Sequence, residues 1–310
     1  MSCNKNTKGF ILKNYIITCD NLTKTFFRKE KIFGPQIPVH AVSQLSFQVK
    51  TGEFVAFIGP NGGGKSTTVK LLTSILHPTG GKALIAGLNP WEQRKKLCYK
   101  IGVVFGQKSQ LYYQLPAKDT FYLLSASYGL KSSYAKERIK HLTSLFEIEN
   151  LINHPVRTLS LGERMRCELV ASLIHSPSVL FLDEPTIGLD IDAKIRLREY
   201  LKQQVQNEGT TVFLTSHDVA DIEQLCSRVL LINNGKLMLD TSMEQLKQDY
   251  AVEKNIIIHY TDNTKKTMTV QSQDTNKIIK ELCNEKEFSD LTIQSTGLDK
   301  IISALYKKTT

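Results

Sequence analysis

A single glycine-rich loop restricts the possible folds of this chain more than any other segment. The loop GPNGGGKST, residues 59–67, satisfies the spacing G-x-x-x-x-G-K-[ST] between a predicted buried strand, EFVAFIGP, and a predicted helix, STTVKLLTSIL. Glycines let the backbone curl so that successive amides point at phosphate oxygens, and the helix adds its positive N-terminal dipole. The segment therefore predicts a phosphate cradle on an α/β fold. Its residues are Gly59, Pro60, Asn61, Gly62, Gly63, Gly64, Lys65, Ser66 and Thr67.

Two side chains of this loop have predicted tasks. Lys65 is expected to reach the β and γ phosphates of a nucleotide, and the hydroxyl of Ser66 is expected to bind Mg²⁺. A glycine-rich turn that matches the spacing by chance is the alternative for this motif taken alone.

Strand and helix patterns alternate along most of the chain, which predicts a mostly parallel sheet covered on both faces. Residues 111–157 instead show apolar positions at helical spacing and few strand signals, so we expect an all-helical insert there. Asn234-Gly235, between two apolar runs, predicts a hairpin turn. Strand and helix patterns after residue 241 predict a small second domain. The expected domains are therefore 1–240 and 241–310, the latter α+β.

Two carboxylates follow the buried strand pattern VLFL. Ligand sites in open α/β sheets lie at the carboxyl ends of strands, and neighbouring strand residues point to different sides. We therefore expect Asp183 to hold the Mg²⁺ shell and Glu184 to orient or deprotonate an attacking water. An acidic pair after a strand is also a common helix cap, so the pair alone is weak evidence.

The segment LSLGERM, residues 159–165, resembles the ABC signature, usually LSGGQ. Leu161 and Glu163 depart from that pattern, whereas Ser160 and Gly162 are retained. The resemblance implies that Ser160, Leu161, Gly162 and Glu163 act on ATP bound to the opposite subunit. A Ser-capped helix start is also expected here, and the two interpretations are compatible because a helix N-terminus binds anions.

Further matches follow in the order of the ABC family. Gln107 resembles the Q-loop glutamine, which implies contact with Mg²⁺ and the attacking water. Asp190, in Gly-Leu-Asp, resembles the D-loop at the dimer interface, and His217 resembles the switch histidine that contacts the γ-phosphate. Phe26 matches the aromatic that stacks on adenine, with Phe27 as the alternative.

The resemblance covers about residues 15–240 and implies a P-loop NTPase fold of the ABC cassette type. Such a cassette has a mixed sheet with helices on both faces, antiparallel β elements and a helical subdomain. The implied function is an ATP-hydrolysing transporter subunit with ATP and Mg²⁺ as cofactors. ATP would close a head-to-tail dimer, either a homodimer or a pair with a homologous ATPase, and hydrolysis would reopen it.

The implied partner is a transmembrane permease on a separate chain, which would place this protein peripherally on the cytoplasmic side of the cell membrane. The stretch FGQKSQLYYQLP, residues 105–116, resembles export-type ABC ATPases and favours export. No apolar run approaches the roughly 20 residues of a membrane-spanning helix, so another chain is expected to cross the bilayer. Six scattered cysteines without a C-x-x-C pair argue against zinc and against a disulfide framework, and favour a reducing cytosol.

The formal charge of +10 permits a different class of function, a soluble ABC protein that acts on ribosomes or DNA. Proteins of that class usually carry two cassettes, a coiled-coil insertion or zinc modules. The sequence shows none of these features, so no nucleic-acid partner is expected.

Overall fold

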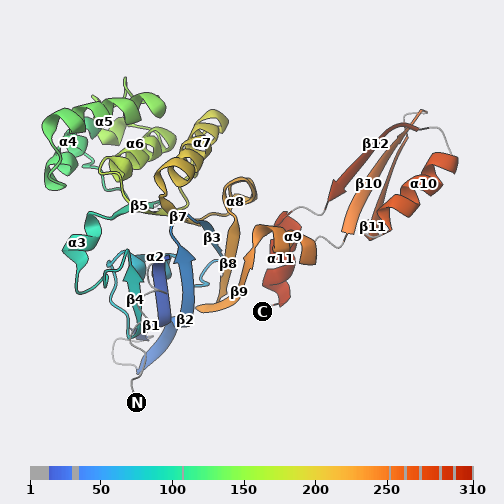
Figure 1. Cartoon of the computed structure of the whole chain (residues 1–310), viewed down its shortest axis with the longest axis horizontal. Helices are drawn as coiled ribbons and strands as arrows, with labels where there is room; N and C mark the ends of the chain where they lie inside the picture. Colours follow the sequence, from blue (N-terminus) through green and yellow to red (C-terminus); the bar gives the residue numbers. More distant parts are fainter. Residues whose placement is uncertain are drawn as a thin grey trace, which may run out of the picture. The chain divides into compact units, whose positions relative to one another are not determined.

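The computed structural model describes residues 14–29, 35–106, 108–250, 253–261, 264–271, 274–285, 288–295 and 298–308. The chain divides into two compact units, Met1–Asp240 and Thr241–Thr310, which are described separately. Figure 1 shows their elements in sequence colours.

A six-stranded sheet with the strand order β5-β6-β7-β3-β8-β9 forms the centre of the first unit. Neighbouring strands from β5 to β8 are parallel. Every residue of β3 and β7 is buried, which is typical of a parallel sheet covered on both faces and confirms the predicted α/β fold. The strands are β3 (Phe54–Ile58), β5 (Ile101–Phe105), β6 (Val179–Asp183), β7 (Thr211–Thr215), β8 (Arg228–Asn233) and β9 (Lys236–Ser242).

The predicted hairpin turn connects β8 to β9. Asn234 and Gly235 have φ angles of 47° and 73°, the positive values that a two-residue hairpin turn requires. The Asn-Gly prediction is confirmed.

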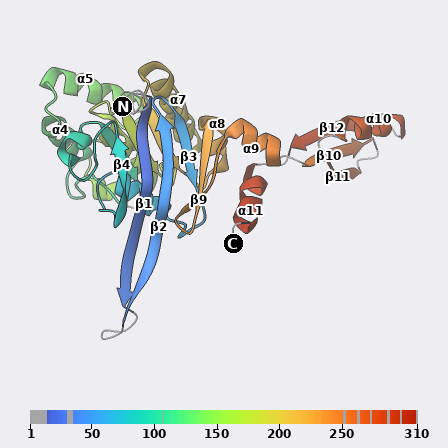
Figure 2. The same cartoon turned by 60° about the horizontal axis from the view of Figure 1, so that its bottom comes forward.

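A second sheet is antiparallel and has the order β2-β1-β4, with β1 (Tyr15–Lys29), β2 (Gln36–Lys50) and β4 (Gly80–Ile85). Strands β1 and β2 form the long ribbon that is prominent in Figure 2. Strand patterns for this ribbon are evident in the sequence only at residues 15–20 and 41–50, so the ribbon is longer than the sequence indicates. The outer part of the ribbon is exposed, so it lacks the burial alternation from which strands are recognised.

Helices complete the first unit: α2 (Lys65–Leu72), α3 (Arg94–Cys98), α4 (Ala117–Ser127), α5 (Ser132–Leu145), the 3₁₀ helix η1 (Val156–Thr158), α6 (Leu161–Leu173), α7 (Ile191–Glu208) and α8 (Val219–Leu225). Helices α4, α5 and α6 lie side by side in Figure 1. Buried Phe121, Leu142 and Phe146 belong to the core of this helical group.

An aromatic cluster stabilises the strand that leads into the glycine-rich loop. The ring of Phe57 on β3 lies 5.0 Å from that of Phe213, and Phe213 lies 5.9 Å from Phe47 and 5.7 Å from Phe181. Rings packed at these distances anchor β3 between its neighbours.

The second unit contains α9 (Met243–Tyr250) and a three-stranded antiparallel sheet with the order β11-β10-β12. Its strands are β10 (Glu253–Tyr260), β11 (Lys265–Gln271) and β12 (Phe288–Ser295), and its other helices are α10 (Thr275–Glu285) and α11 (Leu298–Lys308). Ile256, Ile258 and Val270 form the buried centre of this sheet. No helix in the described part of the whole chain combines the length and apolar character needed to cross a membrane.

Candidate active site

The glycine-rich loop connects β3 to α2 and is supported from behind. Gly64 has a φ angle of 106°, and a Cβ atom placed on it would lie 2.5 Å from the carbonyl oxygen of Ala41 on β2, so only glycine fits. The amide of Gly235, in the β8–β9 turn, donates to the carbonyl of Gly63 at 3.0 Å. Strand β2 and the hairpin turn therefore fix the shape of the loop.

The start of α2 has the chemistry of an anion site. Among the residues that the structure describes, no side chain caps this helix, and its first turn contains no acidic residue. The Nζ atom of Lys65 donates to the carbonyls of Gly59 at 2.6 Å and Pro60 at 3.1 Å, so the ammonium lies over the loop. Burial lowers the pKa of Lys65, whereas Glu184 and Asp183 act to raise it. The uncapped helix and the ammonium together suit a polyphosphate.

Asp183 and Glu184 lie where β6 ends, and their side chains have different partners. The carboxylate of Asp183 accepts a short hydrogen bond from the hydroxyl of Thr215 at the end of β7. The amide of Glu184 donates to the carbonyl of Thr215 at 3.0 Å, and Glu184 has a φ angle of 57°. A residue other than glycine in this left-handed region costs about 1 to 2 kcal/mol, so the backbone at Glu184 is strained.

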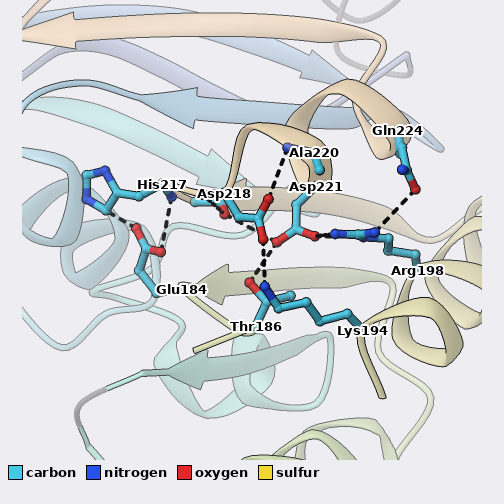
Figure 3. Close-up of polar contacts among 10 residues, drawn as sticks. Glu184, Thr186, Lys194, Arg198, His217, Asp218, Ala220, Asp221 and Gln224 are labelled. Atoms are coloured by element: carbon cyan, nitrogen blue, oxygen red, sulfur yellow. Dashed lines mark hydrogen bonds and ion pairs between the residues drawn. The ribbon is translucent and has the colours of Figure 1, made fainter. Parts of the chain in front are cut away.

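Glu184 and His217 meet across the ends of β6 and β7, as Figure 3 shows. The amide of His217 donates to Oε2 of Glu184 at 3.2 Å, and Nε2 of His217 lies 3.4 Å from Oε1. Burial raises the pKa of the Glu184 carboxyl, although His217 and Lys65 act to lower it. Apart from that contact with His217, the buried Oε1 has no hydrogen-bond donor within the described ranges. A carboxylate with raised pKa and a free acceptor suits a base that receives a proton from water.

The signature segment forms the start of α6. The hydroxyl of Ser160 accepts from the amide of Glu163 at 3.3 Å, and the amide of Ser160 donates to Oε2 of Glu163 at 2.8 Å. These hydrogen bonds form a capping box, and they lower the pKa of Glu163. Glu163, a departure from the usual signature, thus acts locally by fixing the helix start.

The D-loop segment packs against the signature segment of the same chain. Gly188 adopts a φ angle of 79° beside Leu161 and Gly162. Asp190 caps α7, and its Oδ1 accepts from the amide of Ala193 at 2.7 Å. Leu161 is 44% exposed and Ile191 is 76% exposed, so this face presents apolar side chains to solvent.

Gln107 and the candidate adenine-stacking residues are the remaining predictions for the site. Gln107 lies outside the described residues. Phe26 and Phe27 are both exposed on β1, and Nζ of Lys24 lies 5.1 Å from the centre of the Phe26 ring. Stacking of Phe26 on adenine stays a prediction.

The sequence interpretation missed several residues that support the site. Thr215 holds Asp183, and Glu168 on α6 accepts hydrogen bonds from the hydroxyl of Ser109 and, at 3.2 Å, from the amide of Gln110. Glu168 thus ties the segment that follows Gln107 to the signature helix. The sequence gives one indication of this contact, the acidic Glu168 within the apolar pattern CELVASL. A single acidic residue in such a pattern does not identify its partner.

Comparisons with known proteins agree with this geometry. Residues 42–187 match the ABC transporter family. The ABC transporter ATP-binding protein NatA of Bacillus subtilis is 31% identical over 245 residues, which are 79% of this chain and 96% of NatA. The SkfA peptide export ATP-binding protein SkfE of Bacillus subtilis is 32% identical, with 70% of this chain and 89% of SkfE covered. A dimeric post-hydrolysis structure of the ATP-binding cassette MJ0796 with ADP and Pi has a TM-score of 0.65 at 25% identity, and covers 73% of this chain and 98% of that one.

Proposed function

This chain belongs to the ABC transporter ATP-binding proteins and is an ATPase, and on that premise we propose that it powers export through a permease on a separate chain. One observation carries the hydrolytic part of this proposal: Glu184, with its raised pKa and free acceptor, faces His217 at the same sheet edge as the glycine-rich loop. Similarity to SkfE, which is named as a peptide export protein, supports export over import.

We assign the phosphates of ATP to the loop at residues 59–67, with the α2 amides and Lys65 as donors. Oxygen donors suit Mg²⁺, and the hydroxyl of Ser66 and the carboxylate of Asp183 at this edge fit that requirement, with Gln107 as a further candidate. When bound, Mg²⁺ would neutralise charge on the phosphate oxygens. Phe26 is the candidate for adenine stacking.

The chain's own residues then act on the attacking water. The carboxylate of Glu184 orients the water and accepts its proton as the water oxygen attacks the γ-phosphorus and the bond to the β-phosphate oxygen breaks. His217 holds the Glu184 carboxylate through its amide, and Nε2 of its ring lies 3.4 Å from Oε1 of Glu184. In our proposal this ring contacts the γ-phosphate. Lys65 balances negative charge on the phosphates.

A second cassette, either a copy of this chain or a homologous ATPase, completes each site in our proposal. Ser160, Leu161, Gly162 and Glu163 would act on the ATP of the opposite subunit, and Asp190 would lie at the interface. The capped start of α6 and the exposed apolar side chains of Leu161, Ile187 and Ile191 support an interface on this face. ATP would close the dimer, and charge repulsion between the products would reopen it.

The permease would dock near the helical group. Exposed Tyr112 and Tyr113 follow closely after Gln107, and exposed Tyr122 and Leu123 lie on α4. Exposed aromatic side chains are typical of protein interfaces, so this surface supports a partner chain. The chain would then lie peripherally on the cytoplasmic side of the membrane.

Purification of the tagged chain from detergent-solubilised membranes tests this proposal. We expect a multi-helix membrane protein to co-purify and phosphate release to depend on ATP and Mg²⁺. Recovery of nucleic acid that dissociates as salt is raised, without a membrane protein, would instead support a soluble ABC protein.

A further inference from the structure

A fully buried carboxylate lies next to the segments that carry Glu184 and His217. Asp221 on α8 is 0% exposed. Figure 3 shows it between Thr186, Arg198 and the segment that carries His217. Burying an ionised carboxylate is unfavourable unless it is well paired, so its partners indicate what the carboxylate does.

The two oxygens of Asp221 have different partners. Oδ2 accepts from the hydroxyl of Thr186 at 2.7 Å and from the hydroxyl of Ser216 at 3.4 Å. Oδ1 accepts from Nε of Arg198 at 2.7 Å and lies 2.5 Å from its Nη2. Arg198 therefore holds the carboxylate in one orientation, with Oδ2 directed at two loops.

Those loops carry the catalytic pair. Thr186 follows Glu184 by two residues, and Ser216 directly precedes His217. The same loops are also joined by the Glu184–His217 contacts of 3.2 and 3.4 Å and by the hydrogen bonds of Thr215, and Asp221 adds a link that is anchored to α7. One oxygen of Asp221 thus links the loop that carries Glu184 to the loop that carries His217, through the hydroxyls of Thr186 and Ser216.

A second ion pair supports the same segment. Nζ of Lys194 lies 2.7 Å from Oδ2 of Asp218, and the amide of Asp218 donates to the hydroxyl of Ser216 at 3.0 Å. Lys194 and Arg198 are four residues apart, so they lie on one face of α7. Helix α7 therefore holds the His217 segment at two points.

We propose that Asp221 is a positioning residue that sets the geometry of Glu184 and His217 by hydrogen-bonding both of their loops. The proposal rests on the catalytic roles proposed above for this pair. A displacement of about 1 Å at a reacting group can lower a rate by up to about a hundredfold, so the hydroxyl of Thr186 should affect turnover without touching nucleotide.

Thr186→Val tests the link, because valine keeps the shape of threonine and removes the hydroxyl. We expect kcat for ATP hydrolysis by the full chain to fall about tenfold while KM for ATP stays within about twofold. Thr186→Ser keeps a hydroxyl and should restore most of the rate. In a Glu184→Gln background, Thr186→Val should lower the residual rate by less than about twofold. The reason is that the carboxylate of Glu184, whose loop contains Thr186, is already lost.

Thr143→Val is the matched control, since Thr143 is buried on α5 and its hydroxyl donates to a helix carbonyl at 3.1 Å. It should leave kcat unchanged, and thermal melts of both valine variants will show that each is folded. An unchanged kcat in Thr186→Val overturns the proposal, as does a tenfold loss that persists in the Glu184→Gln background. Normal turnover by Glu184→Gln itself would instead remove the proposed catalytic role of Glu184.

Discussion

Gly162 of the signature segment lies directly against Gly188 of the D-loop segment: a Cβ atom placed on Gly162 would be 2.4 Å from the carbonyl oxygen of Gly188. That oxygen belongs to the backbone, so a side chain at position 162 must displace one segment or the other. Two segments assigned to the dimer interface are thus in mutual contact within one chain.

Gly162→Ala should therefore separate the two segments. We expect ATP hydrolysis to fall about tenfold and the free energy of unfolding to fall by about 1 to 3 kcal/mol, as measured by phosphate release and urea denaturation. Gly129→Ala is the control, because a Cβ atom there meets no described atom within 4 Å. Gly129→Ala should be less stable, because alanine is strained at the positive φ angle of this position, but it should hydrolyse ATP at the normal rate. Wild-type turnover in Gly162→Ala would show that the close contact is not required.

Lys65→Ala should weaken ATP binding by about a hundredfold, because a buried ammonium that faces phosphate is removed. Titration with a fluorescent ATP analogue measures this change. Lys70→Ala, a change on the same helix, should bind the ATP analogue with the affinity of the unmodified protein. Equal affinity in Lys65→Ala and Lys70→Ala would contradict the assignment of the loop as the phosphate cradle.

Glu184→Gln should bind ATP and turn over about 10² to 10⁴ times more slowly, since an amide cannot accept the proton of the attacking water. ATP should then trap a closed dimer, visible by size-exclusion chromatography with light scattering. Glu199→Gln changes an exposed acid on α7 and should hydrolyse ATP at the normal rate. A fast, monomeric Glu184→Gln variant would remove Glu184 from the catalytic role.

The same substitution should raise stability at neutral pH. Burial raises the pKa of Glu184 above its ordinary value of 4.5, so the folded state favours the protonated form. The resulting stabilisation is full below the ordinary pKa and is lost as pH rises through the raised pKa. Glu184→Gln should thus have the higher melting temperature near pH 7.5, with the difference shrinking toward pH 4.5. A constant difference across that range would contradict a buried, ionised Glu184.

The candidate site could be predicted from the sequence because its motifs depend on local spacing. The run of glycines followed by Lys65 and Ser66 permits few backbone paths, and Asp183 and Glu184 follow an unmistakable buried strand. The helix start capped by Ser160 was also predicted, whereas the capping box that Glu163 completes was evident only in the structure.

Contacts between distant segments could not be predicted in this way. Asp221 and Thr186 are 35 positions apart and meet only because β6 and β7 are neighbours. The outer half of the β1–β2 ribbon was missed because both of its faces are exposed. Periodicity reports burial, so an unburied strand leaves little trace in the sequence.

The left-handed backbone at Glu184 has an evolutionary consequence. Glycine would adopt a φ angle of 57° without strain, so a single change could relax the fold and abolish turnover together. Loss of the ATPase at this position would then relieve backbone strain, so selection for ATP hydrolysis is needed to retain the acid. ABC proteins that bind ATP without hydrolysing it should therefore arise readily from ancestors with this backbone conformation.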